Sequence, residues 1–235
     1  MKSYLDLRIW KVAWPVCFGY LPLGIACGIF AQKAGFGLTE ALGLCLIVYA
    51  GSGQFIGMAM MLASASVVSI TLTIFIVNLR HFLFSSFLSQ YLRHKTRPFL
   101  AFYAYEITDE SFAVNLNAFK HADWTADDAL KVNNISHLTW TVSNIIGFVG
   151  AGFISIDTRL VGYTLTAMFI GLWASYLNQR KMFFAGIFSG ILGVVLAMFV
   201  GYKMHIVLAA TIVSSLFCFL ELKEDRSKKI RETDE

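Results

Sequence analysis

Two long stretches without a charged residue restrict the fold of this chain more than any other feature. No Asp, Glu, Lys or Arg occurs between Lys11 and Lys33, and none occurs between Glu40 and Arg80. The hydrocarbon core of a bilayer is about 30 Å thick, and a helix needs about 20 residues to cross it. The first stretch is long enough for one crossing, and the second for two crossings with a turn near residues 63–66. We therefore predict an all-helical, polytopic membrane bundle.

The remaining apolar stretches extend this prediction to seven crossings and leave one segment open. Residues 98–119 have apolar side chains at helical spacing but also carry Glu106, Asp109 and Glu110. This segment is either an eighth, polar-faced crossing or a helix that lies partly in the membrane interface. The seven predicted crossings cover residues 11–33, 38–62, 67–92, 134–156, 160–177, 182–200 and 204–220.

Lys and Arg in the loops predict the orientation, because cytoplasmic loops are enriched in these residues. The charged tail, residues 222–235, and the loop at Arg180 and Lys181 share one side under either count, and we predict that this side is cytoplasmic. The N-terminal segment, residues 1–12, joins it only if the open segment crosses, which its basic residues favour. Residues 13–221 between these ends form the predicted membrane domain, multi-pass in a bacterial plasma membrane.

Composition and motifs exclude several other classes. The chain is 57% hydrophobic and only 14% charged, which does not suit a water-soluble domain. Its four cysteines lie in apolar runs without a CxxC pair, so they form no disulfide framework and no zinc site. No basic stripe indicates nucleic-acid binding. No P-loop, HExxH or GxGxxG motif indicates ATPase, metalloprotease or dinucleotide chemistry. We therefore expect no cofactor, no metal and no nucleic acid.

Arg80 and its neighbours Asn78 and His81 interrupt the third predicted crossing near its middle. A charge at the centre of a spanning helix costs about 3 kcal/mol or more, so it normally faces a partner or a water-filled cavity. One interpretation is a structural pair with a carboxylate such as Glu106 or Asp109. The other is a role on the path of a substrate or proton, and the two are compatible because a pair can open.

The motif YAGSGQF, residues 49–55, places two glycines around a serine at membrane depth. Glycine weakens a helix, so Gly51 and Gly53 predict a discontinuous helix whose freed backbone N–H and C=O groups can meet a polar ligand. Ser52 and Gln54 add polar side chains at the same level, and a buried amide needs partners. The alternative is a kink or close helix packing. Gly24 and Gly28, in the first crossing, have the GxxxG spacing that favours close helix contact.

The motif EITDESF, residues 106–112, holds three carboxylates. Glu106, Asp109 and Glu110 are spaced to share one face of a helix. Clustered and buried carboxylates retain protons more readily, which suits a proton carrier. The alternative is a solvated acidic face near the membrane surface.

An enzymatic alternative rests on AGSG, residues 50–53, which differs by one residue from the GxSG around the serine of rhomboid proteases. His81, on another crossing, would have to activate Ser52, and the other signatures of those proteases are missing. We therefore predict that the chain is not an enzyme. Any transport would then draw on an ion or proton gradient, or on the gradient of the substrate itself.

An internal repeat is a further possibility. A shift that aligns Gly28 with Gly152 places VYAGSGQ, residues 48–54, over LWASYLN, residues 172–178. Transporters are commonly built from structural repeats, with the site at the repeat interface. The match is short, so it is either the trace of a repeat or chance.

The polar motifs together resemble those of a known family. YAGSGQF, then NLRH at residues 78–81, then TDESF at residues 108–112 resemble, in order and separation, the AzlC family. Its members are the large subunits of bacterial branched-chain amino acid exporters. GYLPLGIACGIFA, residues 19–31, and HLTWTVSNIIGFVGAG, residues 137–152, are similar to two spans of that family. The likeness extends from about residue 14 to residue 198.

The resemblance implies an exporter of leucine, isoleucine, valine and often methionine. It also implies a small membrane partner of the AzlD type and the proton motive force as energy source. Where many relatives carry Asp-Phe, this chain has Gly162-Tyr163, which puts substrate range or coupling in doubt. Two alternatives stay open at this point: a non-transporting membrane subunit that assembles or regulates a partner, and a channel for a small solute.

A transport mechanism assigns a role to each candidate residue. The carboxylate of the substrate would meet Arg80 or the backbone N–H groups near Gly51, Ser52 and Gly53. The other predicted contacts are Ser52, Gln54 and Asn78 to the amino-acid head, Phe55 and Met58 to the apolar tail, and His81, Glu106, Asp109 and Glu110 for proton coupling.

Overall fold

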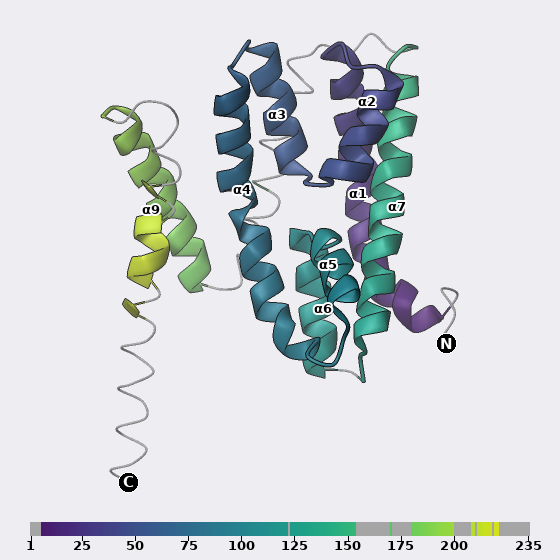
Figure 1. The fold of residues 1–235 in the computed structure, drawn as a ribbon. Coiled ribbons are helices and arrows are strands. Elements are labelled where there is room, and N and C mark those ends of the chain that lie inside the picture. Colours follow the sequence, from purple (N-terminus) through teal and green to yellow (C-terminus); the bar gives the residue numbers. More distant parts are fainter. Residues whose placement is uncertain are drawn as a thin grey trace. The chain divides into compact units, whose positions relative to one another are not determined.

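The structure is a computed structural model that describes residues 6–121, 123–153, 170, 180–199, 208–209, 211–217 and 219–220. Every regular element in these residues is a helix (Figure 1). This confirms the all-helical prediction for the described part of the chain. The chain forms two compact units, residues 1–166 and 167–235, and each is described by itself.

Three long helices form the frame of the first unit: α1 (Leu7–Lys33), α4 (Val67–Leu88) and α7 (Ala126–Gly150). Helix α4 continues into a short 3-10 turn, η2 (Ser89–Tyr91). Within the described residues, α1 and α4 with η2 are the helices long and apolar enough to cross a bilayer. Large side chains such as Trp14 on α1 and Phe82 on α4 lie on exposed faces of these helices. Such faces suit contact with lipid.

Glycines bring α1 and α7 into close contact. A Cβ atom on Gly28 would overlap the backbone carbonyl oxygen of Asn144, and one on Gly147 would overlap that of Ile25. A Cβ atom on Gly24 would overlap the Ser143 side chain. Gly24 and Gly28 are the predicted GxxxG pair, and their close packing is confirmed.

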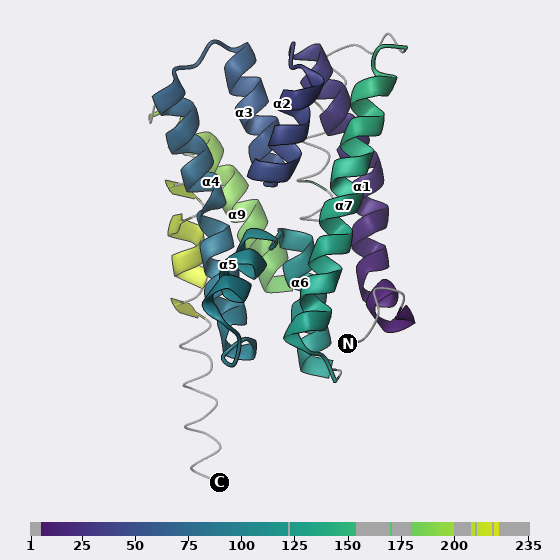
Figure 2. The same ribbon diagram turned by 45° about the vertical axis from the view of Figure 1, so that its right-hand side comes forward.

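Residues 38–62 form a hairpin and not one crossing. Helix α2 (Leu38–Gly43) and the π-helix η1 (Leu44–Val48) lead to a break, and α3 (Ser52–Leu62) follows it. In Figures 1 and 2, α2 and α3 run in opposite directions, so α3 returns to the end of the unit from which α2 starts. Tyr49 and Gly51, with φ of 35° and 43°, reverse the chain. The predicted crossing 38–62 was therefore wrong, because each half is too short to span a bilayer.

Residues 97–121 form a second hairpin, which enters from the opposite end of the unit (Figure 2). Helix α5 (Arg97–Tyr105) leads to a break at Glu106, and α6 (Asp109–His121) returns. Thr108 caps the start of α6: its hydroxyl accepts the Ser111 N–H at 3.2 Å, and the Ser111 hydroxyl accepts the Thr108 N–H at 3.0 Å. The segment 98–119 is therefore neither an eighth crossing nor a single interfacial helix.

A buried polar contact joins the second hairpin to α7. The Asn115 amide on α6 donates to the Asn133 side chain at 2.8 Å, and the Trp124 indole donates to Asn115 at 3.2 Å. Helix α7 begins directly after Thr125, which forms a capping box with Asp128.

The second unit contains α9 (Arg180–Ala197) and further helical residues in 208–220. The rings of Phe188 and Phe217 lie 6.3 Å apart and pack these helices together. Residues 160–169 and 171–177 of the fifth predicted crossing, the repeat segment 172–178 and Gly162 lie outside the described residues. Because residues 38–62 and 98–119 form hairpins, a total of seven or eight crossings no longer follows. The crossings at 160–177, 182–200 and 204–220 stay predictions.

The hairpin geometry predicts which loops are labelled from the same side of the membrane. In a chain without its native cysteines, Ala34→Cys and Ala63→Cys should react with an impermeant maleimide from one side, because they flank the first hairpin. Thr96→Cys, at the far end of α4, should react only from the other side. Labelling of Ala34→Cys and Ala63→Cys from opposite sides would contradict the hairpin and support a full crossing at 38–62.

Candidate functional site

The tips of the two hairpins meet near the middle of α4. The Tyr105 hydroxyl, at the end of α5, donates to the Leu46 carbonyl oxygen in η1. Side chains from α4, α7 and α1 complete the junction. Irregular backbone at membrane depth is tolerated where it is buried in protein or lines a cavity. The junction is therefore the candidate functional site.

Arg80 on α4 joins the two tips. Its guanidinium donates to the Ser52 hydroxyl at 2.5 Å and pairs with the Asp109 carboxylate at 2.8 Å. Ser52 starts α3 and Asp109 starts α6, so one cation bonds the first residue of each returning helix. The Nε atom of Arg80 is buried without a partner among the described residues. The guanidinium thus keeps an unused donor.

His137 on α7 joins the same tips from the other side. Its Nδ1 lies 3.0 Å from both carboxylate oxygens of Glu106, and its Nε2 lies 3.0 Å from the Cys45 carbonyl oxygen. The Tyr49 ring stacks on the imidazole with centroids 3.8 Å apart. The sequence reading missed His137, although an imidazole inside the apolar stretch 134–156 carries the same signal that singled out Arg80.

The three acidic side chains do not form one cluster. Glu106 ends α5 and bonds His137, while Asp109 and Glu110 begin α6. Asp109 pairs with Arg80, and Glu110 accepts from the Tyr20 hydroxyl of α1 at 2.8 Å. The prediction that they share one helical face was wrong, because the chain breaks between Glu106 and Asp109.

The other residues predicted around the break lie on different sides of it. Gln54 accepts from the Trp140 indole of α7 at 2.9 Å. The Asn78 amide lies beside Gly53, within 3.5 Å of where a Cβ atom would be. Phe55 points into the core and stacks on Phe30, with ring centroids 6.0 Å apart.

His81 does not join the junction. Its ring lies 6.3 Å from that of Phe84, and it makes no hydrogen bond within the part of the chain that the structure describes. Ser52 accepts its hydrogen bond from Arg80, which leaves the Ser–His dyad of the enzymatic alternative without geometric support.

The backbone amides of the break are partly occupied. Gly53 N–H donates to the Ala50 carbonyl at 2.8 Å, and Gln54 N–H donates to that of Gly51 at 3.0 Å. A ligand carboxylate would have to displace these bonds to reach the amides. The Arg80 guanidinium is therefore the better anion partner at the junction.

A cavity of about 440 Å³ lies between the first hairpin and α4. Gly53 and Gln54 line it at the break, and Met58 lines it from further along α3. Its volume falls in the range of about 300–1,000 Å³ typical of small-molecule sites. Neither Phe55 nor Arg80 lines it. The other lining residues are apolar except Thr71: Phe36, Leu44, Val48, Gly57, Met61, Ile70, Ile74 and Phe75.

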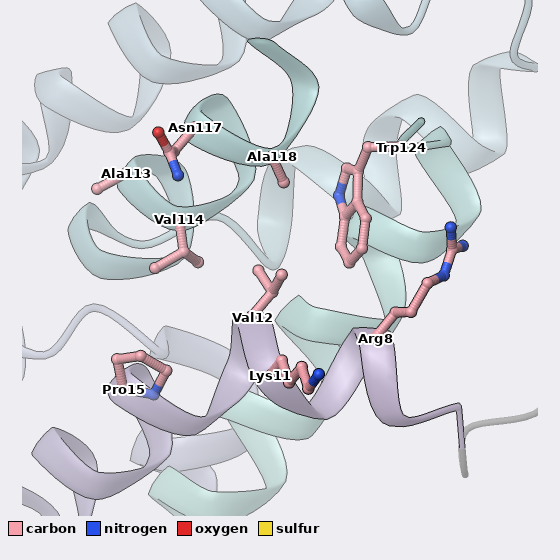
Figure 3. A pocket seen from close by; sticks show the side chains of 9 residues that line it. All are labelled: Arg8, Lys11, Val12, Pro15, Ala113, Val114, Asn117, Ala118 and Trp124. Carbon is pink, nitrogen blue, oxygen red and sulfur yellow. The ribbon is translucent and has the colours of Figure 1, made fainter. Parts of the chain in front are cut away.

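A second cavity, of about 570 Å³, lies between the first turns of α1 and residues 113–118 of α6 (Figure 3). Arg8 and Lys11 reach it from α1, Asn117 comes from α6, and Trp124 precedes α7. None of the predicted site residues lines it. Basic side chains beside a tryptophan are typical of the membrane–water interface, so this cavity marks one end of the first unit.

Sequence comparison connects this architecture to known proteins. The profile of the AzlC protein family matches residues 15–154. Inner membrane protein YgaZ of Escherichia coli is 29% identical over 180 residues, which cover 73% of this chain and 72% of that protein. The branched-chain amino acid transport protein AzlC of Bacillus subtilis is 27% identical over 178 residues, 73% of this chain and 68% of that protein.

An uncharacterized membrane protein of Helicobacter pylori is 29% identical over 181 residues, which cover 74% of this chain and 77% of that protein. No solved structure matches the chain significantly. The junction of the two hairpins lies inside the region that the family profile covers.

Proposed function

Because this chain belongs to the AzlC family, a family of membrane transport proteins, we propose that it is a secondary transporter that exports branched-chain amino acids. The observation that carries this proposal is that Arg80 donates a hydrogen bond to Ser52 and forms an ion pair with Asp109 at the hairpin junction. Such a cation can bind an anionic substrate, and its interactions with Ser52 and Asp109 exist only while the two tips are together. The chemistry is that of an amino-acid carboxylate competing with Asp109.

The proposed binding mode uses polar groups for the head and the cavity for the tail. Asp109 would leave Arg80 when the substrate carboxylate arrives, and would then be free to hold the ammonium group. Ser52, Gln54 and Asn78 surround the same break and supply hydrogen-bond partners for the amino-acid head. The cavity beside Gly53 is largely apolar, so it suits a leucine, isoleucine, valine or methionine side chain.

The basic end of the first unit supports a cytoplasmic N-terminus. Arg8 lies 3.6 Å from Asp128 and Lys95 lies 2.5 Å from Asp127, so the N-terminus, the α4–α5 loop and the start of α7 share that end. At the opposite end of the unit, the basic residue within the described part of the chain is Lys33. The positive-inside rule then favours a cytoplasmic basic end, and we place the C-terminal tail on the same side.

The energy source and partner complete the proposal. We propose that protons returning down their gradient drive export, and that a small AzlD-like membrane subunit completes the transporter. The protein name of the Bacillus relative supports the substrate class. The exposed apolar faces of α1 and α4 offer surface for a membrane partner as well as for lipid.

Counterflow in proteoliposomes tests the function. Vesicles that contain the protein and its partner subunit, preloaded with unlabelled leucine, should take up labelled leucine faster than protein-free vesicles. Unlabelled valine and methionine should compete, whereas glutamate should not, because the cavity wall is apolar. Uptake into vesicles with an acidic lumen should exceed uptake without a pH gradient.

The alternatives predict other results in the same vesicles. A channel would show flux that neither saturates nor responds to the pH gradient. A non-transporting subunit would show no flux when Arg80 is intact, and its variants would change only the abundance of the partner. Either pattern would end the proposal of a secondary transporter.

A further inference from the structure

We propose that His137 and Glu106 form the proton-binding site that couples transport to the proton gradient. This inference rests on the proposed function and assigns its proton to a specific pair. His137 lies on α7, and its partners lie on the tips of the two hairpins. The pair therefore lies where its protonation can control whether the two hairpins stay in contact.

Hydrogen-bond geometry limits the protons that the pair can hold. A backbone carbonyl only accepts, so Nε2 of His137 must carry the hydrogen that lies toward Cys45, 3.0 Å away. Nδ1 faces the Glu106 carboxylate at 3.0 Å, and one hydrogen must lie between them as well. That hydrogen belongs either to an imidazolium beside a carboxylate or to a neutral imidazole beside a carboxylic acid. In both arrangements the pair holds one more proton than a neutral imidazole with a carboxylate.

Loss of this proton breaks one of the two contacts. If Nε2 keeps its hydrogen, the Nδ1 lone pair faces the Glu106 carboxylate, and the two acceptors repel. If the hydrogen moves to Nδ1, the Nε2 lone pair faces the Cys45 carbonyl oxygen instead. The imidazole cannot hold both hairpins without the proton, so protonation and contact between the tips are linked.

Burial protects the proton while the tips are together. Glu106 is 3% exposed and His137 is 9% exposed, and the Tyr49 ring covers one face of the imidazole. A proton can therefore enter or leave mainly when the hairpins part. The proposed cycle follows: substrate at Arg80 or a proton at the pair closes the junction, and the empty junction stays open to one side. Export of substrate and entry of the proton then alternate.

The titratable groups around the pair come from every element packed against it. Tyr49 stacks on the imidazole from the first hairpin, and Tyr105 approaches it edge-on from α5 at 5.9 Å. Glu106 interacts electrostatically with both phenols, and Glu110 interacts with Tyr49. Tyr20 of α1 holds Glu110 through a hydrogen bond, and the Cys45 thiol lies on the residue whose carbonyl the imidazole bonds. Among these, only Glu106 contacts an imidazole nitrogen.

The test separates coupling from exchange. Glu106→Gln replaces the exchangeable hydrogen with a permanent amide N–H that can donate to Nδ1, so the junction can close without a proton. In vesicles with the partner subunit, this variant should still exchange labelled leucine, but an acidic lumen should no longer stimulate uptake. The wild type should show a stimulation of at least about fivefold, the lower end of typical coupling between sites. His137→Gln should also lose the stimulation.

Two other histidines serve as comparisons. His94→Gln, in the exposed loop after α4, should keep the full stimulation. Loss of the stimulation in His81→Gln, with retention in Glu106→Gln, would overturn the assignment, and so would complete loss of exchange in both pair variants. Absence of exchange in the wild type would refute the proposed function itself, which keeps the two failures distinct.

Discussion

Arg80→Ala is expected to abolish leucine efflux from cells loaded with a leucine dipeptide. The change removes the cation that bonds Ser52 at 2.5 Å and Asp109 at 2.8 Å, and it leaves a carboxylate unpaired at the hairpin junction. Truncation of one member of a buried charge pair costs about 2–5 kcal/mol, and this pair is only partly buried, with side-chain exposures of 23% and 26%. The low end of that range applies, so the efflux rate should fall about thirtyfold. The rate is measured per unit of protein in the membrane.

Two further variants separate a substrate role from a structural one. Arg93→Ala removes an exposed arginine from the loop after η2 and should leave efflux unchanged. Arg80→Ala combined with Asp109→Asn removes the uncompensated carboxylate and should restore protein abundance, but not efflux. Recovery of efflux in the double variant would show that Arg80 only neutralises Asp109, and the substrate-binding proposal would fail.

Gly28→Ala is expected to destabilise the protein or to remove it from the membrane. The added methyl group would overlap the Asn144 carbonyl oxygen, and a backbone atom in a packed helix cannot turn aside. Overpacking of this kind typically costs about 1–3 kcal/mol, and more where the backbone must move. The measurement is the midpoint of thermal unfolding in detergent, together with abundance in membranes.

Gly19→Ala is the matched control for this change. It adds the same methyl group to the same helix, but nothing lies within 4 Å of the new atom. Its stability should equal or slightly exceed that of the wild type, because alanine favours helix more than glycine does. Equal effects of the two changes would contradict the close packing of α1 against α7.

Local features of the sequence predicted much of the structure. The glycines around Ser52 predicted an interrupted helix, and a break does separate η1 from α3 there. The cost of a guanidinium at membrane depth predicted a carboxylate partner for Arg80, and Asp109 was one of the two partners considered. Each inference used interactions within a few residues or a strong energetic penalty.

Longer-range relations were not accessible in the same way. The length of residues 38–62 fits one crossing as well as two half-length helices, and only the positive φ angles of Tyr49 and Gly51 reverse the chain. Glu106 and Asp109 lie three positions apart, yet a break between α5 and α6 gives them different partners. Phe55 had no local signal that would direct it to Phe30 rather than to a cavity.

The sequence by itself determined that this chain is an all-helical membrane protein of the AzlC family, because charge-free runs and clustered polar motifs are local properties. Only the tertiary structure decided that two hairpins meet at Arg80 and that His137 links them. The reason is physical: the pairing of His137 with Glu106 and Cys45 joins residues far apart in the chain. Such pairing depends on how helices pack, and no local propensity encodes it.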